Sequence, residues 1–384
     1  MILHTLLDYD VLRVIWWLLL GILLIGFAVT DGFDLGVGTL LPFVAREDVE
    51  RRIVINTIGP IWEGNQVWLV LGGGAIFAAW PHIYAMSFSG FYLAMFAALL
   101  ALILRPVGFK YRSKKESPAW RATWDWCLFI GGFVPSLIFG VAIGNVLQGV
   151  PFNFSPDMRM TYEGSFLGLL NPFAVLCGLV SVAMLVMHGG AWLALKTEGA
   201  VAARARGAAS VAALVTIVLY ALAGLLIWKY VTGYQWTSTH LPNGPSNPLA
   251  KTVQAGIAGG WLTNYANHPW TLLAPVLGFA GALLAFVGLR ARWEGLTLIF
   301  SGLSIAGIIL SVGASMFPFI VPSSTHLASA LTVWDASSSH LTLFIMLVCA
   351  VVFVPLILIY TAWVYSVIWG KVRPRDITHG DHAY

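Results

Sequence analysis

The chain has 384 residues, of which 59% are hydrophobic and only 10% are charged. A soluble domain carries about 25% charged residues, so this composition excludes an ordinary soluble protein. The net charge of +4 does not indicate a nucleic-acid partner, because the positive residues lie in short segments between apolar runs. In such places they set membrane topology and contact anionic lipid headgroups.

Nine apolar runs follow one another along the chain and predict an all-α, polytopic membrane protein. Each is close to the roughly 20 residues that a helix needs to cross about 30 Å of hydrocarbon. The runs are 11–33, 60–80, 83–104, 124–147, 171–195, 208–230, 270–290, 296–320 and 340–369. No gap resembles an independent soluble domain, so we expect residues 1–384 to form a single integral-membrane domain.

Positive charge is concentrated in alternate gaps between these runs. The first, third, fifth and seventh gaps and the C-terminal tail together hold 17 of the 21 lysines and arginines. Cytoplasmic loops carry the excess of these residues. The sequence therefore predicts nine crossings, with the N-terminus in the periplasm and the C-terminus in the cytoplasm.

Three gaps on the predicted outer side are long and poor in lysine and arginine. They are 148–170, 231–269 and 321–339, and the second contains the turn-forming sequence Leu-Pro-Asn-Gly-Pro-Ser-Asn-Pro at 241–248. By contrast, only a few residues around Pro81 join the second and third runs, which predicts a tight antiparallel hairpin.

Four acids and one arginine stand out among the ionisable residues in or beside the apolar runs. Asp31 and Asp34 come at the end of the first run, Glu63 near the start of the second, Arg105 at the end of the third and Asp125 at the start of the fourth. All five are predicted near the cytoplasmic face. Charged groups in membrane spans are costly and usually face a protein interior or water. Asp31 and Asp34 are three residues apart, so they share a face of a helix.

Two interpretations of these residues remain open from the sequence. In the first, the carboxylates form a hydrophilic access route for protons. In the second, Glu63 and Asp125 lie at helix N-termini, where the helix dipole favours an acid, and the others form structural pairs between arginine and carboxylate.

Histidine is scarce within the runs, where His188 is the one well inside a span. Paired histidines at helical spacing, as a haem or metal site would need, do not occur. We therefore expect this chain to ligate no metal or haem by itself.

Several segments resemble subunit II of the cytochrome bd quinol oxidases, which are bacterial respiratory terminal oxidases. Two of them are Gly26-Phe27-Ala28-Val29-Thr30-Asp31-Gly32-Phe33-Asp34 and Trp62-Glu63-Gly64-Asn65-Gln66-Val67-Trp68, and the others are 13–17, 77–81, 88–92, 105–109, 144–145, 149–152 and 316–319. They extend from the first run to the eighth, so the resemblance covers essentially the whole chain.

The resemblance implies a function that periodicity alone could not show. Subunit II of this family works with a subunit I that carries two b haems and one d haem, often with a small single-helix third subunit. The complex oxidises quinol, reduces oxygen to water and generates a proton motive force without pumping, in the bacterial inner membrane. Subunit II holds no essential haem ligand. It supports haem assembly in its partner, helps form proton access from the cytoplasm and can hold a structural quinone.

The resemblance also implies roles for the five ionisable residues. Asp34, Arg105 and Asp125 match acidic and basic positions important to the family, and Glu63 occupies a carboxylate position. We expect Asp31, Asp34 and Glu63 to serve proton access, and Arg105 and Asp125 to form structural ion pairs.

Two other functions would also suit parts of the sequence. A secondary transporter could have nine spans and buried acids, but it should show internal repeats and broken helices at the midplane, and the sequence shows neither. A subunit that assists assembly only, with no part in proton transfer, is the third alternative.

Overall fold

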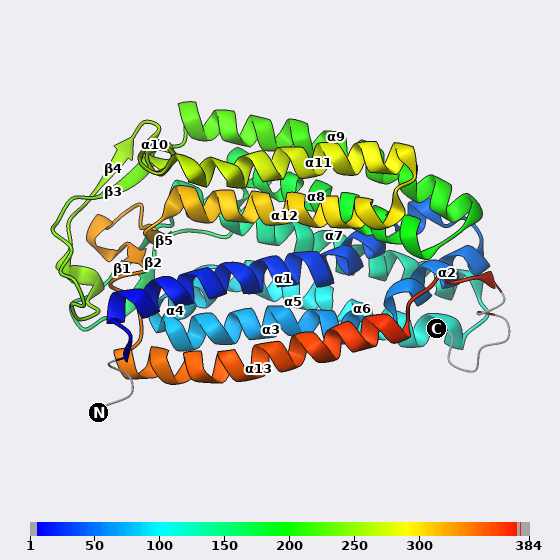
Figure 1. Ribbon diagram of the computed structural model, residues 1–384, viewed down its shortest axis with the longest axis horizontal. Coiled ribbons are helices and arrows are strands. Elements are labelled where there is room, and N and C mark those ends of the chain that lie inside the picture. The colour runs from blue at the N-terminus through cyan, green and yellow to red at the C-terminus, as the bar shows by residue number, and fades with distance from the viewer. Residues whose placement is uncertain (1–5, 375–376, 378–384) are drawn as a thin grey trace.

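Long apolar helices lie side by side along the long axis of the molecule (Figure 1). This computed structural model describes residues 6–374 and residue 377. The longest helices are α1 (Tyr9–Val44), α3 (Trp62–Ala79), α7 (Pro118–Gln148), α8 (Pro172–Lys196), α9 (Gly199–Lys229), α11 (Leu273–Ala291), α12 (Glu294–Met316) and α13 (His340–Val367). The all-α architecture predicted from the sequence is confirmed.

Shorter elements complete the bundle. The short helices are α2 (Asp48–Ile58), α4 (Pro81–Gly90), α5 (Tyr92–Leu102), α6 (Leu104–Tyr111) and α10 (Thr263–Asn267). Single 3₁₀ turns are η2 (Arg112–Lys114), η3 (Leu167–Leu170), η4 (Pro248–Ala250), η5 (Gly260–Leu262), η6 (Pro269–Leu272) and η7 (Leu327–Ser329). Helices α3 and α4 are separated by Trp80 alone, which agrees with the predicted short connection.

Three small antiparallel hairpins lie together at one end of the bundle, opposite α2 (Figure 1). The pairs are β1 (Phe152–Phe154) with β2 (Met160–Tyr162), β3 (Gly233–Trp236) with β4 (Val253–Ile257), and β5 (Phe319–Val321) with β6 (Leu331–Thr332). They come from the three long gaps of the predicted outer side, except that β5 begins in the last residues of the run 296–320. The structure therefore gathers these gaps at one end, as the alternating topology requires.

Eight helical segments of the described chain are long and apolar enough to cross a membrane. They are Tyr9–Val44, Tyr92–Lys114, Pro118–Gln148, Pro172–Lys196, Gly199–Lys229, Pro269–Ala291, Glu294–Met316 and His340–Val367. The second predicted run also forms a helix, α3, but its first turns carry Glu63, Asn65 and Gln66 and make it less apolar than the others. Nine crossings and the orientation stay predictions.

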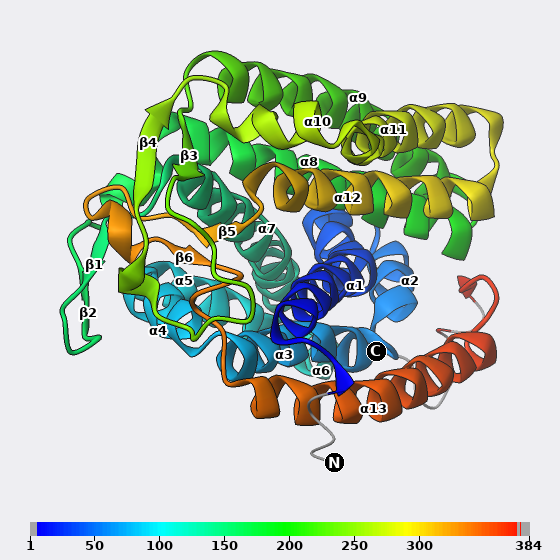
Figure 2. The same ribbon diagram turned by 60° about the vertical axis from the view of Figure 1, so that its left-hand side comes forward.

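Helix α1 occupies the centre of the bundle (Figure 2). It packs against α3 on one side and against α7 and α8 on the other. Glycines allow the closest approach: a Cβ on Gly36 would lie 2.0 Å from the carbonyl oxygen of Leu185, and one on Gly132 would lie 2.4 Å from that of Leu35. The helix backbones touch here, so side chains that α1 directs inward are shielded from solvent.

In contrast to α1, helix α13 is largely exposed. It runs along the outside of the bundle (Figure 1), and Leu343 is the residue that the structure buries in it. Its ends are held by polar contacts. Trp16 donates to the carbonyl of Leu343, and the Lys196 ammonium donates to the carbonyls of Ile368 and Gly370.

Candidate functional site

Two carboxylates and one guanidinium meet in the interior of the bundle. Arg105 of α6 binds Asp31 of α1 through two hydrogen bonds, of 2.7 Å from Nη2 and 3.0 Å from Nη1. The same Nη2 lies 3.8 Å from Oδ2 of Asp34. The side chains of Asp31 and Asp34 are 0% exposed and that of Arg105 is 2% exposed. We call these three residues the buried cluster.

The helix itself explains why both acids reach Arg105. Residues three apart on a helix share a face, so the pairing of Asp31 and Asp34 on one side of α1 follows the sequence prediction. Their depth differs from the prediction. The first run was expected to end at residue 33, but α1 continues to Val44. Because Arg105 compensates the acids, the helix passes through them, and they lie inside the bundle rather than at its inner end.

Asp34 has a second partner that the sequence did not single out. Asn65 of α3 donates from Nδ2 to Oδ2 of Asp34 at 2.8 Å, and the hydroxyl of Tyr365 donates to Oδ1 of Asn65 at 2.7 Å. Oδ1 of Asp34 has no hydrogen-bond partner among the described residues. Asn65 stands in a recognisable polar motif, but Tyr365 is 300 residues further along the chain, where no sequence signal connects the two.

Glu63 lies apart from the buried cluster. It occupies the first turn of α3, as predicted, but its side chain is exposed and makes no ion pair in the described part of the chain. Asn65, two residues later, points inward instead, since residues two apart on a helix do not share a face. Glu63 therefore does not lie beside Asp31 and Asp34, the two other residues expected to serve proton access, in the described part of this chain.

Asp125 forms a separate cluster near α2. It pairs with Arg51 of α2 at 2.7 Å and with Arg112 of η2, so Arg105 is not its partner. It is not at a helix N-terminus either, because α7 already begins at Pro118. The ion pairing predicted for Asp125 is present, but the dipole explanation for it is wrong.

Asp48 extends this second group of charges. It lies 2.9 Å from Arg112 and 2.9 Å from Arg121. The five residues of this α2 cluster are Arg51, Arg112, Arg121, Asp48 and Asp125. They tie α2 and η2 to the start of α7. Three guanidinium groups face two carboxylates here, whereas in the buried cluster two carboxylates face one guanidinium.

His188 of α8 is fully engaged inside the bundle. One ring nitrogen lies 2.7 Å from Oγ of Ser301, and the other lies 2.9 Å from the carbonyl oxygen of Val29. Neither nitrogen is left to serve as an axial ligand. Within residues 6–374 and 377, no group of three or more His, Cys, Asp or Glu side chains is placed to hold a metal ion.

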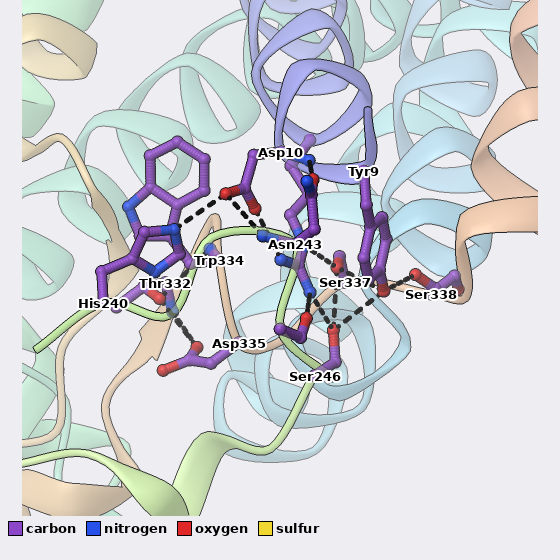
Figure 3. Close-up of polar contacts among 12 residues, drawn as sticks. Tyr9, Asp10, His240, Asn243, Ser246, Thr332, Trp334, Asp335, Ser337 and Ser338 are labelled. Atoms are coloured by element: carbon purple, nitrogen blue, oxygen red, sulfur yellow. Dashed lines mark hydrogen bonds and ion pairs between the residues drawn. The ribbon is translucent and has the colours of Figure 1, made fainter. Parts of the chain in front are cut away.

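A third polar group lies at the strand-bearing end, around the start of α1 (Figure 3). Asp10 accepts hydrogen bonds from Arg13, from the backbone N–H of Asn243 and, at 2.9 Å, pairs with His240. Arg13 also donates to the carbonyl of Gly244. These contacts fasten the loop around the predicted turns at 241–248 to the first helix.

The same group holds the segment that leads into α13. Arg13 donates from Nε to Oγ of Ser337, and the Tyr9 hydroxyl donates to the carbonyl of Ser338 (Figure 3). A buried pair lies nearby, with Nζ of Lys251 2.6 Å from Oδ2 of Asp335. Burial raises the pKa of Asp335 above its ordinary value, although Lys251 opposes this. The contacts join two loops and a helix, so we interpret this group as structural.

The fold and its buried charges define an integral membrane protein with ionised groups inside a helical bundle. Residues 12–368 match the family model described as cytochrome bd terminal oxidase subunit II. The chain therefore belongs to the cytochrome bd terminal oxidase subunit II family.

Curated relatives agree with this assignment over nearly their whole length. The chain is 52% identical to cytochrome bd-I ubiquinol oxidase subunit 2 of Escherichia coli (strain K12) over 376 residues, which cover 98% of this chain and 99% of the relative. It is 32% identical to cytochrome bd ubiquinol oxidase subunit 2 of Bacillus subtilis (strain 168), with 94% and 97% covered.

The fold is also that of a solved bd oxidase. A chain of the bd oxidase from Geobacillus thermodenitrificans superposes with a TM-score of 0.67 at 16% sequence identity, covering 94% of this chain and 99% of that one. At this identity the match concerns the fold alone.

These findings settle the class of function. The protein is subunit II of a cytochrome bd-type terminal oxidase, an oxidoreductase complex of the bacterial inner membrane that contains haem and a subunit I partner. The secondary-transporter alternative is not supported.

Proposed function

We propose that this subunit forms part of the route by which cytoplasmic protons reach the site of oxygen reduction, and that the buried cluster is the part of the route in this chain. The relatives are named ubiquinol oxidase subunits, which supports quinol as the electron donor of the complex. The family resemblance supports b and d haems carried by subunit I, a small third subunit and a structural quinone.

The observation that carries the proposal is the unequal charge of the buried cluster. Asp31 and Asp34 share one arginine, and all three side chains are almost completely removed from solvent. Fully ionised, the cluster holds one negative charge in excess. An uncompensated charge in such a place is costly, and binding one proton removes the excess.

Asp34 is the better of the two acids for proton exchange. Asp31 is held by both terminal nitrogens of Arg105, which favours its ionised form. Asp34 receives one amide hydrogen bond and a 3.8 Å contact with Arg105, and its Oδ1 is free of partners among the described residues. A proton bound at this oxygen displaces no existing hydrogen bond. We therefore assign the exchanging proton to Asp34 and a supporting role to Asp31.

We propose that Glu63 also serves proton access, as a carboxylate at the surface of this subunit. It is exposed on the same first turn of α3 that directs Asn65 to Asp34. A partner subunit that covers this turn would bring Glu63 into a proton route from outside this chain. Arg105 and Asp125 are then residues of structural ion pairs.

The test is oxygen consumption by the purified complex, expressed per haem, for Asp34→Asn. This variant keeps the shape of the side chain and removes the exchanging group, so we expect a fall of about 10-fold or more in turnover. Glu63→Gln should lower turnover less. Asp157→Asn, at an acid that is 60% exposed and lies in the loop between β1 and β2, is the matched control.

Haem content separates proton transfer from assembly. If Asp34→Asn complexes carry full haem and keep wild-type turnover and proton uptake across roughly pH 6–9, the cluster is structural and the proposal is wrong. A complex that loses haem instead would support a role for this subunit in haem assembly only.

A further inference from the structure

Tyr365, on the outermost helix, is joined to Asp34 by a chain of two short hydrogen bonds. Its hydroxyl lies 2.7 Å from Oδ1 of Asn65, and Nδ2 of Asn65 lies 2.8 Å from Oδ2 of Asp34. The three side chains come from α13, α3 and α1. The tyrosine ring is placed by Trp192, whose ring meets it nearly at right angles with centroids 6.1 Å apart.

An asparagine between two polar groups can be oriented in two ways. Its amide has an oxygen that accepts and a nitrogen that donates, and rotation by half a turn exchanges them. In the observed orientation the nitrogen faces the Asp34 carboxylate, and the oxygen accepts the tyrosine hydroxyl. An ionised carboxylate only accepts, so it draws the amide nitrogen, and the tyrosine hydroxyl stabilises this donor orientation by donating to the amide oxygen.

This orientation determines which oxygen of Asp34 can take a proton. Oδ2 accepts the amide hydrogen bond and also faces Arg105 at 3.8 Å, whereas Oδ1 has no partner in the described part of the chain. Resting on the function proposed above, we propose that Tyr365 is a positioning residue that acts through Asn65 to confine proton exchange at Asp34 to its Oδ1 atom.

The other charged groups near α1 do not take over the positioning of Asn65 by Tyr365. Asp31 and Arg105 face Asp34 from α1 and α6 and are bound to one another. His188 of α8 has both ring nitrogens engaged. Asp125 of α7 is bound to arginines of the α2 cluster.

Of the remaining elements packed on α1, α3 carries Glu63, whose carboxylate is exposed at the surface, and α9 and α12 carry charges that are paired. Arg204 of α9 lies 2.6 Å from Glu50 of α2, and Glu294 of α12 lies 2.8 Å from Lys371, which follows α13. Among the described residues, Asn65 is thus the neutral donor to Asp34, and Tyr365 is the residue that donates to the amide oxygen of Asn65.

Loss of the tyrosine hydroxyl should leave the fold intact. Helix α13 is attached at its ends, by Trp16 to Leu343 and by Lys196 to Ile368 and Gly370, and Tyr365 is only partly buried. The variant Tyr365→Phe keeps the ring against Trp192. It releases the Asn65 amide, which can then rotate and accept a hydrogen bond from protonated Asp34.

The experiment is the dependence of turnover per haem on pH in the purified complex. Since Tyr365→Phe favours the protonated form of Asp34, we expect the alkaline limb of the profile to move to higher pH by about half a unit to one unit, the size of one neutral hydrogen bond. Tyr360→Phe, on the same helix with a side chain that is 62% exposed, is the matched control and should leave the profile in place.

A double variant distinguishes positioning from a general structural effect. Asn65→Ala removes the donor to Asp34 and should also move the profile to higher pH. If Tyr365 acts through Asn65, adding Tyr365→Phe to Asn65→Ala produces no further shift. Independent, additive shifts would overturn the inference, as would a Tyr365→Phe profile that coincides with the control.

The outcomes for Asp34 and Tyr365 can be told apart. If Asp34→Asn keeps wild-type turnover, the proposed function itself fails. If Asp34→Asn is impaired and Tyr365→Phe behaves as the control, only the positioning role fails. Should Tyr365→Phe not assemble, Asn65→Ala alone must show the shift, and an unshifted profile then rejects the inference.

Discussion

The buried cluster and the α2 cluster are built from the same residue types in opposite proportions. In the buried cluster two aspartates share Arg105, and all three side chains are at most 2% exposed. In the α2 cluster three arginines surround two aspartates, and Arg51, Arg121 and Asp48 are 25–37% exposed. The first has an excess of negative charge in the interior, and the second has an excess of positive charge near water.

This difference distinguishes a cluster that can exchange protons from a cluster that holds helices together. Excess carboxylate inside a bundle can be neutralised by taking up a proton, which a relay requires. Excess guanidinium cannot be relieved in this way, because arginine does not lose its proton in proteins. An arginine-rich cluster in contact with solvent instead holds helices together, as the ion pairs between α2, η2 and α7 do. We therefore expect substitution of the carboxylates in the buried cluster to affect turnover, loss of its single guanidinium to affect assembly, and substitutions in the α2 cluster to affect stability.

The largest effect is expected from Arg105→Gln. It leaves two buried carboxylates without their cation, and breaking a buried pair in this way costs about 3–5 kcal/mol. We expect little assembled complex, measured as haem-containing protein in detergent extracts of membranes. Adding Asp31→Asn should restore part of the yield, because it removes one of the orphaned charges. If the double variant is no better than Arg105→Gln alone, the charge imbalance is not the cause.

A smaller effect is expected from Asp125→Asn. The substitution removes a partner from Arg51 and from the buried Arg112, while Asp48 still compensates Arg112. We expect a loss of stability of about 1–3 kcal/mol, seen as faster thermal inactivation, with unchanged turnover per haem. A fall in turnover per haem comparable to that of Asp34→Asn would contradict the division between the two clusters.

The sequence predicts the helices better than the contacts between them. Hydropathy and helix periodicity are local properties, so runs of apolar residues identified the long helices and the shared face of Asp31 and Asp34. The first run was ended too early, at residue 33, because two acids look like the end of a span. Compensation by Arg105, which comes from another helix, lets α1 continue to Val44.

The partners of the candidate residues could not be predicted in the same way. Which helix Arg105 faces depends on how α1, α6 and α7 pack, and the glycine contacts that set this packing have no periodic signal. Asn65 could have been noticed as a polar residue in an apolar helix. Tyr365 could not, because an aromatic residue near the end of a span is ordinary at a membrane interface.

A still smaller effect is expected from Arg121→Gln. The pair between Arg121 and Asp48 is partly exposed, with side chains 25% and 37% accessible. Pairs of this kind contribute about 0–1 kcal/mol and weaken with salt. Thermal inactivation in low-salt buffer should be slightly faster than for the wild type, and the difference should vanish near 1 M salt. If the difference in inactivation rate persists at high salt, the ion pair of Arg121 is shielded from salt and the prediction is wrong.

The smallest effect concerns Glu50, which anchors α2 from its first turn. Its carboxylate is partly buried, which opposes ionisation, but it accepts hydrogen bonds from Arg204 and from the backbone N–H groups of Arg46 and Glu47, and these hold its pKa below the ordinary value. A depressed pKa means that the folded state binds its proton less readily than the unfolded state. The stabilisation is therefore complete above the unfolded pKa of about 4.3 and is lost as pH falls through the lower folded value. Glu50→Gln removes this contribution, of less than about 1 kcal/mol, so it should inactivate slightly faster than the wild type at pH 7. As pH falls below about 4 the two proteins should converge, and a gap that widens on acidification would show that Glu50 is not held as an ionised anchor.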